Sequence, residues 1–210
     1  MKVVINMVKG WGKVLPFYLF ILLPLFASCS EADDQTDEWD DWQNRNDVFF
    51  ANQYQNHSEQ TERSFVLPSW AMPTNREQGV VLHTQCVLVD VIVSGPASTV
   101  SPLYSDSVAI NYRGRLMPTK HYPEGYEFDR SYQKYYDPDV DVPVCLPLTN
   151  VVEGFSTVLQ KMHVGDLWRV TIPYQLGYGA TEKTGIPAYS TLIFDVELVD
   201  FWTKKKGDRY

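Results

Sequence analysis

The sequence predicts an α+β fold in which a sheet curls around one short helix, with a helical extension before it. From residue 81 onward, four segments alternate apolar and polar side chains with the period of strands that bury one face. Among them lies one convincing helical pattern, within residues 151–166. A sheet with one apolar face needs a covering layer, and this short helix is the available candidate. The sheet is therefore expected to wrap around it.

The first 28 residues predict a lipoprotein signal peptide. A basic region ends at Lys13, and the apolar run of 13 residues after it is shorter than the about 20 residues that a membrane span needs. Cys29 follows Ala27 and Ser28, which resembles the lipobox of bacterial lipoproteins, where the cysteine thiol is diacylated. An ordinary secretory signal with a chance cysteine is the alternative. We expect lipidation at Cys29 and a place in the cell envelope, anchored to the outer membrane on its periplasmic or surface-exposed face.

The charge of the chain argues against a nucleic-acid partner. The whole chain carries a net charge of −8, and removal of the three lysines in the first 28 residues leaves −11. Binding of phosphate groups needs clustered lysine and arginine side chains, so we expect no nucleic acid to bind. Residues 29–36 are strongly acidic and are expected to form a tether that leaves the membrane surface.

Residues 37–80 are expected to hold a helical extension and a connector. Aromatic side chains recur at roughly helical spacing within residues 37–58, namely at Trp39, Trp42, Phe49, Phe50 and Tyr54. This stripe could dock on the main domain or form a partner or dimer contact over residues 39–54. Docking is favoured because no heptad repeat persists. Two prolines, Pro68 and Pro73, then predict an irregular connector over residues 64–79.

Residues 81–203 are predicted to form the main domain, followed by a polar tail at 204–210. The alternating segments lie at residues 87–93, 108–113, 168–172 and 192–198. In the helical segment, Phe155, Val158, Leu159 and Met162 fall at i, i+3, i+4 and i+7, which places them on one helix face. Two valines precede this helix where polar capping residues are usual.

Five segments of the main domain resemble one known family. They are "VAINYRGRL", "YEFDRS", "NVVEGFSTVLQKMHVGDLWRVTIP", "LGYGA" and "IPAYSTLIFDVELVDF", and they occur in this order with short gaps. Together they resemble the FKBP family of peptidyl-prolyl cis–trans isomerases over residues from about 81 to 202. The resemblance implies a twisted, five-stranded antiparallel sheet wrapped around one short helix. It also implies isomerisation of Xaa–Pro bonds in proline-containing, exported polypeptides, by a non-covalent mechanism with no metal or cofactor.

The resemblance places a proline-binding pocket between the helix and the sheet. The catalytic residues that it implies are Asp129, Tyr178 and Phe155, and the implied substrate-binding residues are Tyr112, Phe128, Val142, Val151, Val152, Ile186 and Phe194. In the family, the counterparts of the Tyr178 hydroxyl and the Val152 backbone N–H donate hydrogen bonds to substrate carbonyls. Asp129 would meet the carbonyl side of the twisting bond, and Phe155 would form the pocket floor.

The sequence also departs from the family at this pocket. Phe155 stands where tryptophan is most common, and Val142 stands where phenylalanine is common. Both changes remove aromatic area from the pocket walls. A weakly active or inactive module of the same fold, which binds polypeptides as a chaperone, is therefore the alternative function. A third hypothesis is a surface lipoprotein whose aromatic helix recruits a partner, with the isomerase fold as its scaffold.

Two cysteines of the main domain are expected to remain thiols. In an oxidising compartment two spare cysteines would pair by default. By the strand order of the family, however, Cys86 opens the first strand and Cys145 lies in the strand before the helix, with three strands between them. At about 4.8 Å per strand the two are on the order of 19 Å apart. A disulfide needs Cα atoms within about 7 Å.

Overall fold

The computed structural model describes residues 38–72, 82–98, 100–133 and 140–203. These residues belong to one unit that begins at Glu38. The predicted signal peptide, Cys29, the acidic tether and the polar tail lie outside the described residues. The helices are α1 (Trp42–Asn56), α2 (Glu153–Leu159) and the short 3-10 turns η1 (His83–Gln85), η2 (Leu148–Asn150) and η3 (Tyr174–Leu176). The strands are β1 (Ser64–Pro68), β2 (Cys86–Val93), β3 (Asp106–Leu116), β4 (Glu127–Arg130), β5 (Val144–Pro147), β6 (Leu167–Ile172) and β7 (Leu192–Thr203).

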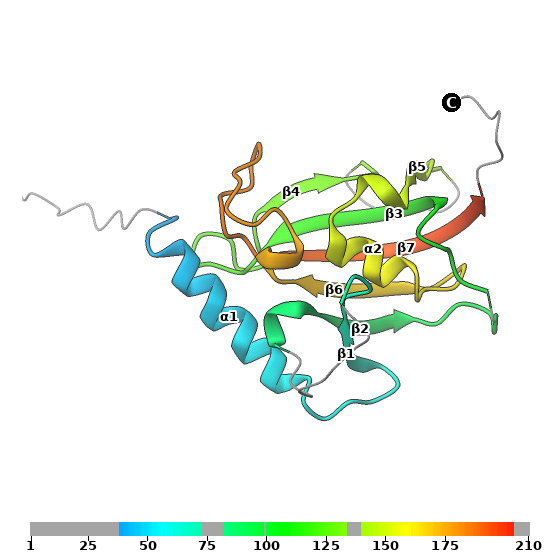
Figure 1. The fold of residues 1–210 in the computed structure, drawn as a ribbon. Helices are drawn as coiled ribbons and strands as arrows, with labels where there is room; N and C mark the ends of the chain where they lie inside the picture. The colour runs from blue at the N-terminus through cyan, green and yellow to red at the C-terminus, as the bar shows by residue number, and fades with distance from the viewer. Residues whose placement is uncertain (1–37, 73–81, 99, 134–139, 204–210) are drawn as a thin grey trace, which may run out of the picture. The chain divides into compact units, whose positions relative to one another are not determined.

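The described strands form one antiparallel sheet. Its order is β1-β2-β6-β7-β3-β4, and β5 also pairs with β3. Figure 1 shows α2 against this sheet, with β1 and β4 at opposite edges. The mixed α and β architecture, the antiparallel pairing and the positions of the alternating segments agree with the prediction, because β2, β3, β6 and β7 contain the four segments. The predicted count of five strands is wrong, since the described residues form seven.

One additional strand comes from the predicted connector. Instead of being irregular throughout, residues 64–68 form β1, which pairs with β2 from Ser64 opposite Asp90 to Pro68 opposite Cys86. Pro68 is tolerated because it ends a strand at the edge of the sheet, where a missing N–H disturbs the ladder least. Phe65 packs edge-on against Trp168 of β6, with ring centroids 5.7 Å apart. The sheet therefore begins before residue 81.

The other difference in strand count arises at the opposite edge. Both β4 and β5 pair with β3, but over different parts of it. β4 lies opposite residues 113–115 and β5 lies opposite residues 107–110. β3 therefore has two separate partners on this side, β4 and β5.

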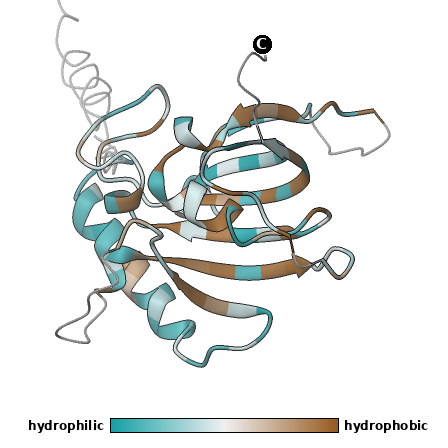
Figure 2. Cartoon of the chain, turned by 45° about the vertical axis from the view of Figure 1, so that its right-hand side comes forward, coloured by the Kyte–Doolittle hydropathy of each residue, from teal (hydrophilic) through white to brown (hydrophobic). Residues whose placement is uncertain are grey.

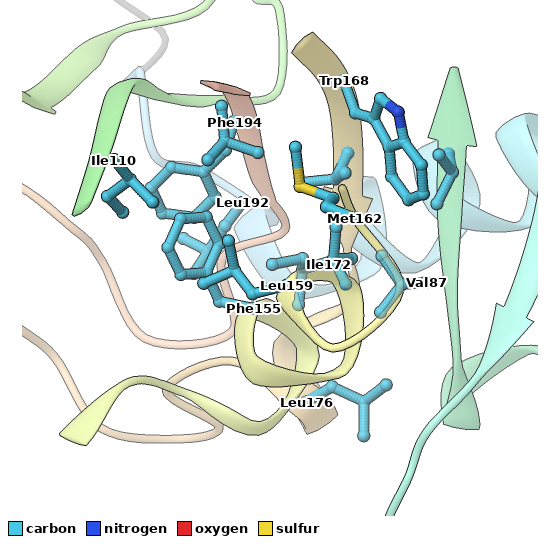
Figure 3. Close-up of a cluster of buried hydrophobic side chains, with 14 of the residues drawn as sticks. Val87, Ile110, Phe155, Leu159, Met162, Trp168, Ile172, Leu176, Leu192 and Phe194 are labelled. Atoms are coloured by element: carbon cyan, nitrogen blue, oxygen red, sulfur yellow. The ribbon is translucent and has the colours of Figure 1, made fainter. Parts of the chain in front are cut away.

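The core lies between α2 and the sheet (Figure 3). Phe155, Val158, Leu159 and Met162 are all buried, which confirms the predicted apolar face of this helix. They pack with strand residues such as Ile172, and α2 lies so close to β6 that a Cβ atom on Gly154 would meet Ile172 Cγ2 at 2.3 Å. An alanine there would not fit unless α2 or the Ile172 side chain moved, so Gly154 allows this close approach of the two elements.

A second layer covers the other side of α2. The backbone N–H of Trp70 donates to Thr157 Oγ1 at 3.3 Å, and its indole Nε1 donates to Ser156 Oγ at 3.0 Å. Ser69 donates to the Glu153 carboxylate at the start of the same helix. These contacts explain why the polar residues Ser156 and Thr157 are buried, because the segment after β1 satisfies their hydroxyl groups.

The helical extension docks on the domain, as favoured by the sequence. α1 begins after Asp41, and its residues Trp42 and Phe50 are buried while Val48 remains exposed. Figure 2 shows α1 as mainly hydrophilic in comparison with the strands, and only Trp42, Asn46 and Phe50 of this helix are buried. Aromatic side chains of this extension thus pack against the core of the same chain. No helix in the described ranges is long and apolar enough to cross a membrane.

The two cysteines of the domain lie far apart, as expected. Cys86 opens β2 and Cys145 lies in β5, with β6, β7 and β3 between these strands. Within the described part of the chain neither cysteine forms a disulfide. The predicted strand order is therefore confirmed for these elements.

Candidate active site

A hollow of about 160 Å³ opens between the start of α2 and the sheet. It is lined by Tyr112, Phe128, Asp129, Leu146, Asn150, Val151, Val152, Phe155, Tyr178 and Phe194. These residues come from β3, β4, β5, η2, α2, the turn before α2, the loop after η3 and β7. The hollow is thus built where the sheet meets the start of α2.

Four of the five aromatic rings that line the hollow pack against one another. Phe155 and Phe194 pack at 4.7 Å between ring centroids, and Phe128 meets Phe194 edge-on at 5.6 Å. Tyr112 lies 6.4 Å from Phe155 and 6.1 Å from Phe194, with its ring tilted against both. Such edge-on contacts stabilise aromatic clusters beyond the burial of their area. The rings therefore hold one another in place and leave an apolar surface facing the hollow.

A glycine on β3 makes room for two of these rings. A Cβ atom on Gly114 would lie 2.7 Å from the Phe128 ring and 2.8 Å from the Phe194 ring. Any side chain at residue 114 would displace both rings. Gly114 lies within the quoted segment "VAINYRGRL", but as a glycine inside a predicted strand it gave no direct signal of its role.

The polar part of the hollow centres on Asp129. The Tyr112 hydroxyl donates to Asp129 Oδ2 at 2.7 Å, and the backbone N–H of Arg130 donates to Asp129 Oδ1 at 2.8 Å. Burial, followed by this hydrogen bond and the negative charge of Asp129, raises the pKa of Tyr112 well above its usual range. The Tyr112 hydroxyl therefore stays protonated and keeps the carboxylate oriented.

Tyr178 provides a second hydroxyl at the hollow. It follows η3 and precedes Gly179, whose φ of 60° lets the chain turn back tightly. Burial and then the charge of Asp129 raise the pKa of Tyr178, so its hydroxyl remains a hydrogen-bond donor. The Lys183 amine lies 5.7 Å from the centre of the Tyr178 ring, over its face.

Eight of the ten residues predicted for the pocket line this one hollow. The two exceptions are Val142 and Ile186. Val142 precedes β5 and is 80% exposed, so it forms no wall. Ile186 is buried and instead lines a neighbouring hollow of about 440 Å³, together with Trp39 and Tyr126.

Two lining residues, Leu146 and Asn150, were not predicted. Leu146 lies in β5 opposite Val108 and provides the wall that was assigned to Val142. The position of Leu146 follows from the pairing of β5 with β3, a long-range contact that the sequence pattern did not show. Among the described residues, no group of three or more His, Cys, Asp or Glu side chains is placed to hold a metal ion.

Known proteins resemble the part of the chain that holds this hollow. Residues 99–199 match the family model of FKBP-type peptidyl-prolyl cis-trans isomerases. FkpA of Escherichia coli, named as an FKBP-type peptidyl-prolyl cis-trans isomerase, is 33% identical over 133 residues, which cover 63% of this chain and 44% of FkpA. The peptidyl-prolyl cis-trans isomerase Mip of Coxiella burnetii is 36% identical over 107 residues, covering 50% of this chain and 40% of Mip. The chain therefore spans less than half the length of these relatives.

Solved structures show a similar fold. The crystal structure of Escherichia coli FkpA matches with a TM-score of 0.53 and 26% identity, covering 77% of this chain and 61% of that chain. A peptidyl-prolyl cis-trans isomerase of Pseudomonas syringae matches with a TM-score of 0.52 at 23% identity, covering 78% of this chain and 95% of that chain. Residues 99–199 therefore resemble FKBP-type peptidyl-prolyl cis-trans isomerases in sequence, and the chain resembles solved structures of such isomerases in fold.

Proposed function

We propose that the chain is an active peptidyl-prolyl cis–trans isomerase that acts on Xaa–Pro bonds of exported polypeptides. The observation that supports this proposal is the hollow itself, in which an aromatic wall surrounds the hydroxyl of Tyr178 and the carboxylate of Asp129. It offers an apolar surface for a proline ring beside polar groups that can orient a peptide.

The reaction needs no nucleophile, because no covalent bond to the enzyme has to form. Amide resonance sets a barrier of about 18–20 kcal/mol against rotation of the bond. Without catalysis the exchange takes roughly 10–100 s. The site has to bind the twisted amide more tightly than the planar one. Since a twisted amide has lost resonance, its carbonyl is less polar and loses less solvation free energy in an apolar hollow.

Each polar group has a specific part in this mechanism. The Tyr178 hydroxyl donates a hydrogen bond to a substrate carbonyl, as does the backbone N–H of Val152. The Asp129 carboxylate, held by the Tyr112 hydroxyl at 2.7 Å, meets the carbonyl side of the twisting bond. Phe155, Phe194 and the neighbouring rings hold the proline and exclude water.

A protease-free isomerisation assay on short Xaa–Pro peptides tests this proposal with the full chain. The wild-type chain should accelerate exchange, and Tyr178→Phe and Asp129→Asn should each lower kcat/KM by roughly tenfold, because each loses one charge-assisted or oriented contact. Val142→Ala is the control, because its side chain lies outside the hollow and should leave kcat/KM unchanged. A wild-type chain that binds such peptides without accelerating exchange would replace the enzyme by the binding or chaperone module.

We also propose that this isomerase is a lipoprotein of the cell envelope. Support comes from the basic and apolar runs of residues 1–26 and from the small residues before Cys29. Two acyl chains on one cysteine would anchor the chain stably, where one chain is marginal. Cys29→Ser should abolish fatty-acid labelling and release the chain from the membrane fraction. Continued sedimentation of the variant with membranes would contradict the proposal.

A further inference from the structure

Helix α1 forms hydrogen bonds with the end of the loop that connects η3 to β7. This loop, residues 177–191, carries Tyr178 and is called the pocket loop below. Trp42 Nε1 donates to Ser190 Oγ at 2.9 Å, and the backbone N–H of Thr191 donates to Asn46 Oδ1 at 2.7 Å. Asn46 Nδ2 in turn donates to the carbonyl of Trp42 at 2.8 Å, which fixes the orientation of its amide. All four residues are buried.

This attachment lies next to a strained residue. Tyr189 directly precedes Ser190 and has a φ of 62°, a left-handed conformation that is costly for a residue with a side chain. Its backbone N–H donates to the carbonyl of Gly179 at 2.8 Å, and its ring packs edge-on against Tyr174. Contacts around Tyr189 must stabilise this conformation. The hydrogen bonds from α1 to Ser190 and Thr191 are at the next two residues of the chain.

A continuous set of contacts therefore joins α1 to the pocket. It passes from Trp42 and Asn46 to the 190–191 segment, then through Tyr189 to Gly179, which follows Tyr178 in the chain. The Ser190 hydroxyl also donates to the carbonyl of Pro187 at 2.6 Å, so the end of the pocket loop is held at a third point.

The same extension contacts the other side of the pocket. Trp39, in the turn before α1, packs edge-on against Tyr126 with ring centroids 6.3 Å apart. Tyr126 lies two residues before Phe128 and three before Asp129, and its carbonyl accepts a hydrogen bond from the Leu116 N–H. The extension thus holds both chain segments that carry the polar groups of the hollow.

We propose that α1 positions the isomerase site, with Trp42 and Asn46 as positioning residues for the Tyr178 hydroxyl. This inference rests on the proposed isomerase function. A helix that served only to cover apolar surface would need no buried amide, because apolar contacts alone stabilise docking but allow alternative registers. Buried polar pairs with satisfied partners select one arrangement. Here that arrangement fixes residues 187–191, and through them the turn that carries Tyr178.

The test compares two variants of α1 in the full chain. Trp42→Phe keeps an aromatic ring but removes the donor to Ser190. It should lower kcat/KM by roughly 3- to 10-fold, the range expected when a supporting contact is lost. In a Tyr178→Phe background the same substitution should have almost no further effect, because the group that it positions is absent.

Phe50→Leu is the matched control on the same helix. Phe50 is buried and stacks on His83 at 6.4 Å between ring centroids, whereas the polar contacts to residues 190–191 come from Trp42 and Asn46. It should lower the melting temperature at least as much as Trp42→Phe does, yet leave kcat/KM unchanged while the chain is folded. Equal losses of kcat/KM in both variants would overturn the proposal, since they would show an effect of stability alone.

Amide hydrogen exchange separates this proposal from the proposed function. In Trp42→Phe the amides of Thr191, Tyr189 and Gly179 should exchange faster, while the amides that pair β2 with β6 stay protected. This readout needs no turnover. If the wild-type chain proved inactive but these three amides exchanged faster in Trp42→Phe, the isomerase proposal would fail. The proposal that α1 holds residues 187–191 in place would still be supported. Unchanged exchange at all three amides would contradict the proposal about α1.

Discussion

At the scale of single residues, the hollow depends on side chains whose environment determines their chemistry. Tyr112 and Tyr178 both lie beside Asp129, and burial raises the pKa of each hydroxyl. Both therefore remain neutral donors: Tyr112 donates to Asp129, and Tyr178 donates to a substrate carbonyl in the mechanism that we propose. The Asp129 carboxylate, in contrast, accepts two hydrogen bonds within the chain.

The raised pKa values predict how activity depends on pH. An ordinary tyrosine loses its proton near about pH 10, and a site that relied on one would then lose its donor. Because the folded-state pKa of Tyr178 is raised, kcat/KM should stay level from about pH 7 to about pH 10. The measurement is a pH profile of isomerisation, with Tyr178→Phe as the reference. A fall in wild-type kcat/KM near the ordinary tyrosine pKa, absent from Tyr178→Phe, would contradict the assignment.

Phe155 and Val142 are expected to contribute differently to the stability of the fold. Phe155 is 5% exposed and belongs to the core as well as to the pocket, so Phe155→Ala should lower the free energy of unfolding by roughly 3–5 kcal/mol. Val142 is 80% exposed, and Val142→Ala should change it by less than about 0.5 kcal/mol. Urea unfolding of the full chain measures both. Similar losses in the two variants would show that Val142 is buried in solution.

At the scale of elements, the turn before α1 is attached to the loop between β3 and β4. A hydrogen bond with the Thr119 side chain, followed by the contact with His121, lowers the pKa of Glu38. The folded-state pKa thus lies below the unfolded one. The contact stabilises the fold above the ordinary pKa of glutamate, and this contribution is lost as the pH falls through the lowered value.

Glu38→Gln should therefore reduce stability in a pH-dependent way. The variant should melt at a lower temperature than the wild type near about pH 6, and the difference should shrink toward about pH 3 as Glu38 takes up a proton. Melting curves of both full-length chains over this range provide the measurement. A difference that stayed constant across the range would exclude a role for the Glu38 charge.

The elements that sequence could predict are those with a regular apolar period. The alternation at 168–172 and 192–198 and the i, i+3, i+4, i+7 spacing of Phe155 to Met162 follow from burial of one face. β1 has no such signal, because all five of its residues are only partly buried and a proline ends it. The position of Leu146 depends on where β5 pairs with β3, which is a long-range contact. Resemblance pointed to eight of the residues that line the hollow, on strands, on α2 and in turns, whereas Val142, before β5, does not line it.

At the scale of the folded unit, strand order separates the two cysteines of the domain. Cys86 and Cys145 lie in β2 and β5, with three strands between. In full-length Cys29→Ser, thiol titration after denaturation without reduction should give about two thiols per chain, since their strands cannot bring the sulfur atoms into bonding range. A titration that gave none, from a chain that runs as a monomer without reductant, would contradict the strand order.

The proposed isomerase activity depends on the whole unit, in which the sheet and α2 form the hollow and α1 contacts the segment at residues 190–191 that leads into β7. Exchange spectroscopy by NMR on a short Xaa–Pro peptide tests it most directly, because one spectrum reports both binding and interconversion. With a small molar fraction of the full chain added, exchange peaks between the cis and trans forms should appear on a time scale much shorter than the uncatalysed roughly 10–100 s. Shifted peptide resonances without exchange peaks would mean that the hollow binds proline peptides and does not catalyse their isomerisation.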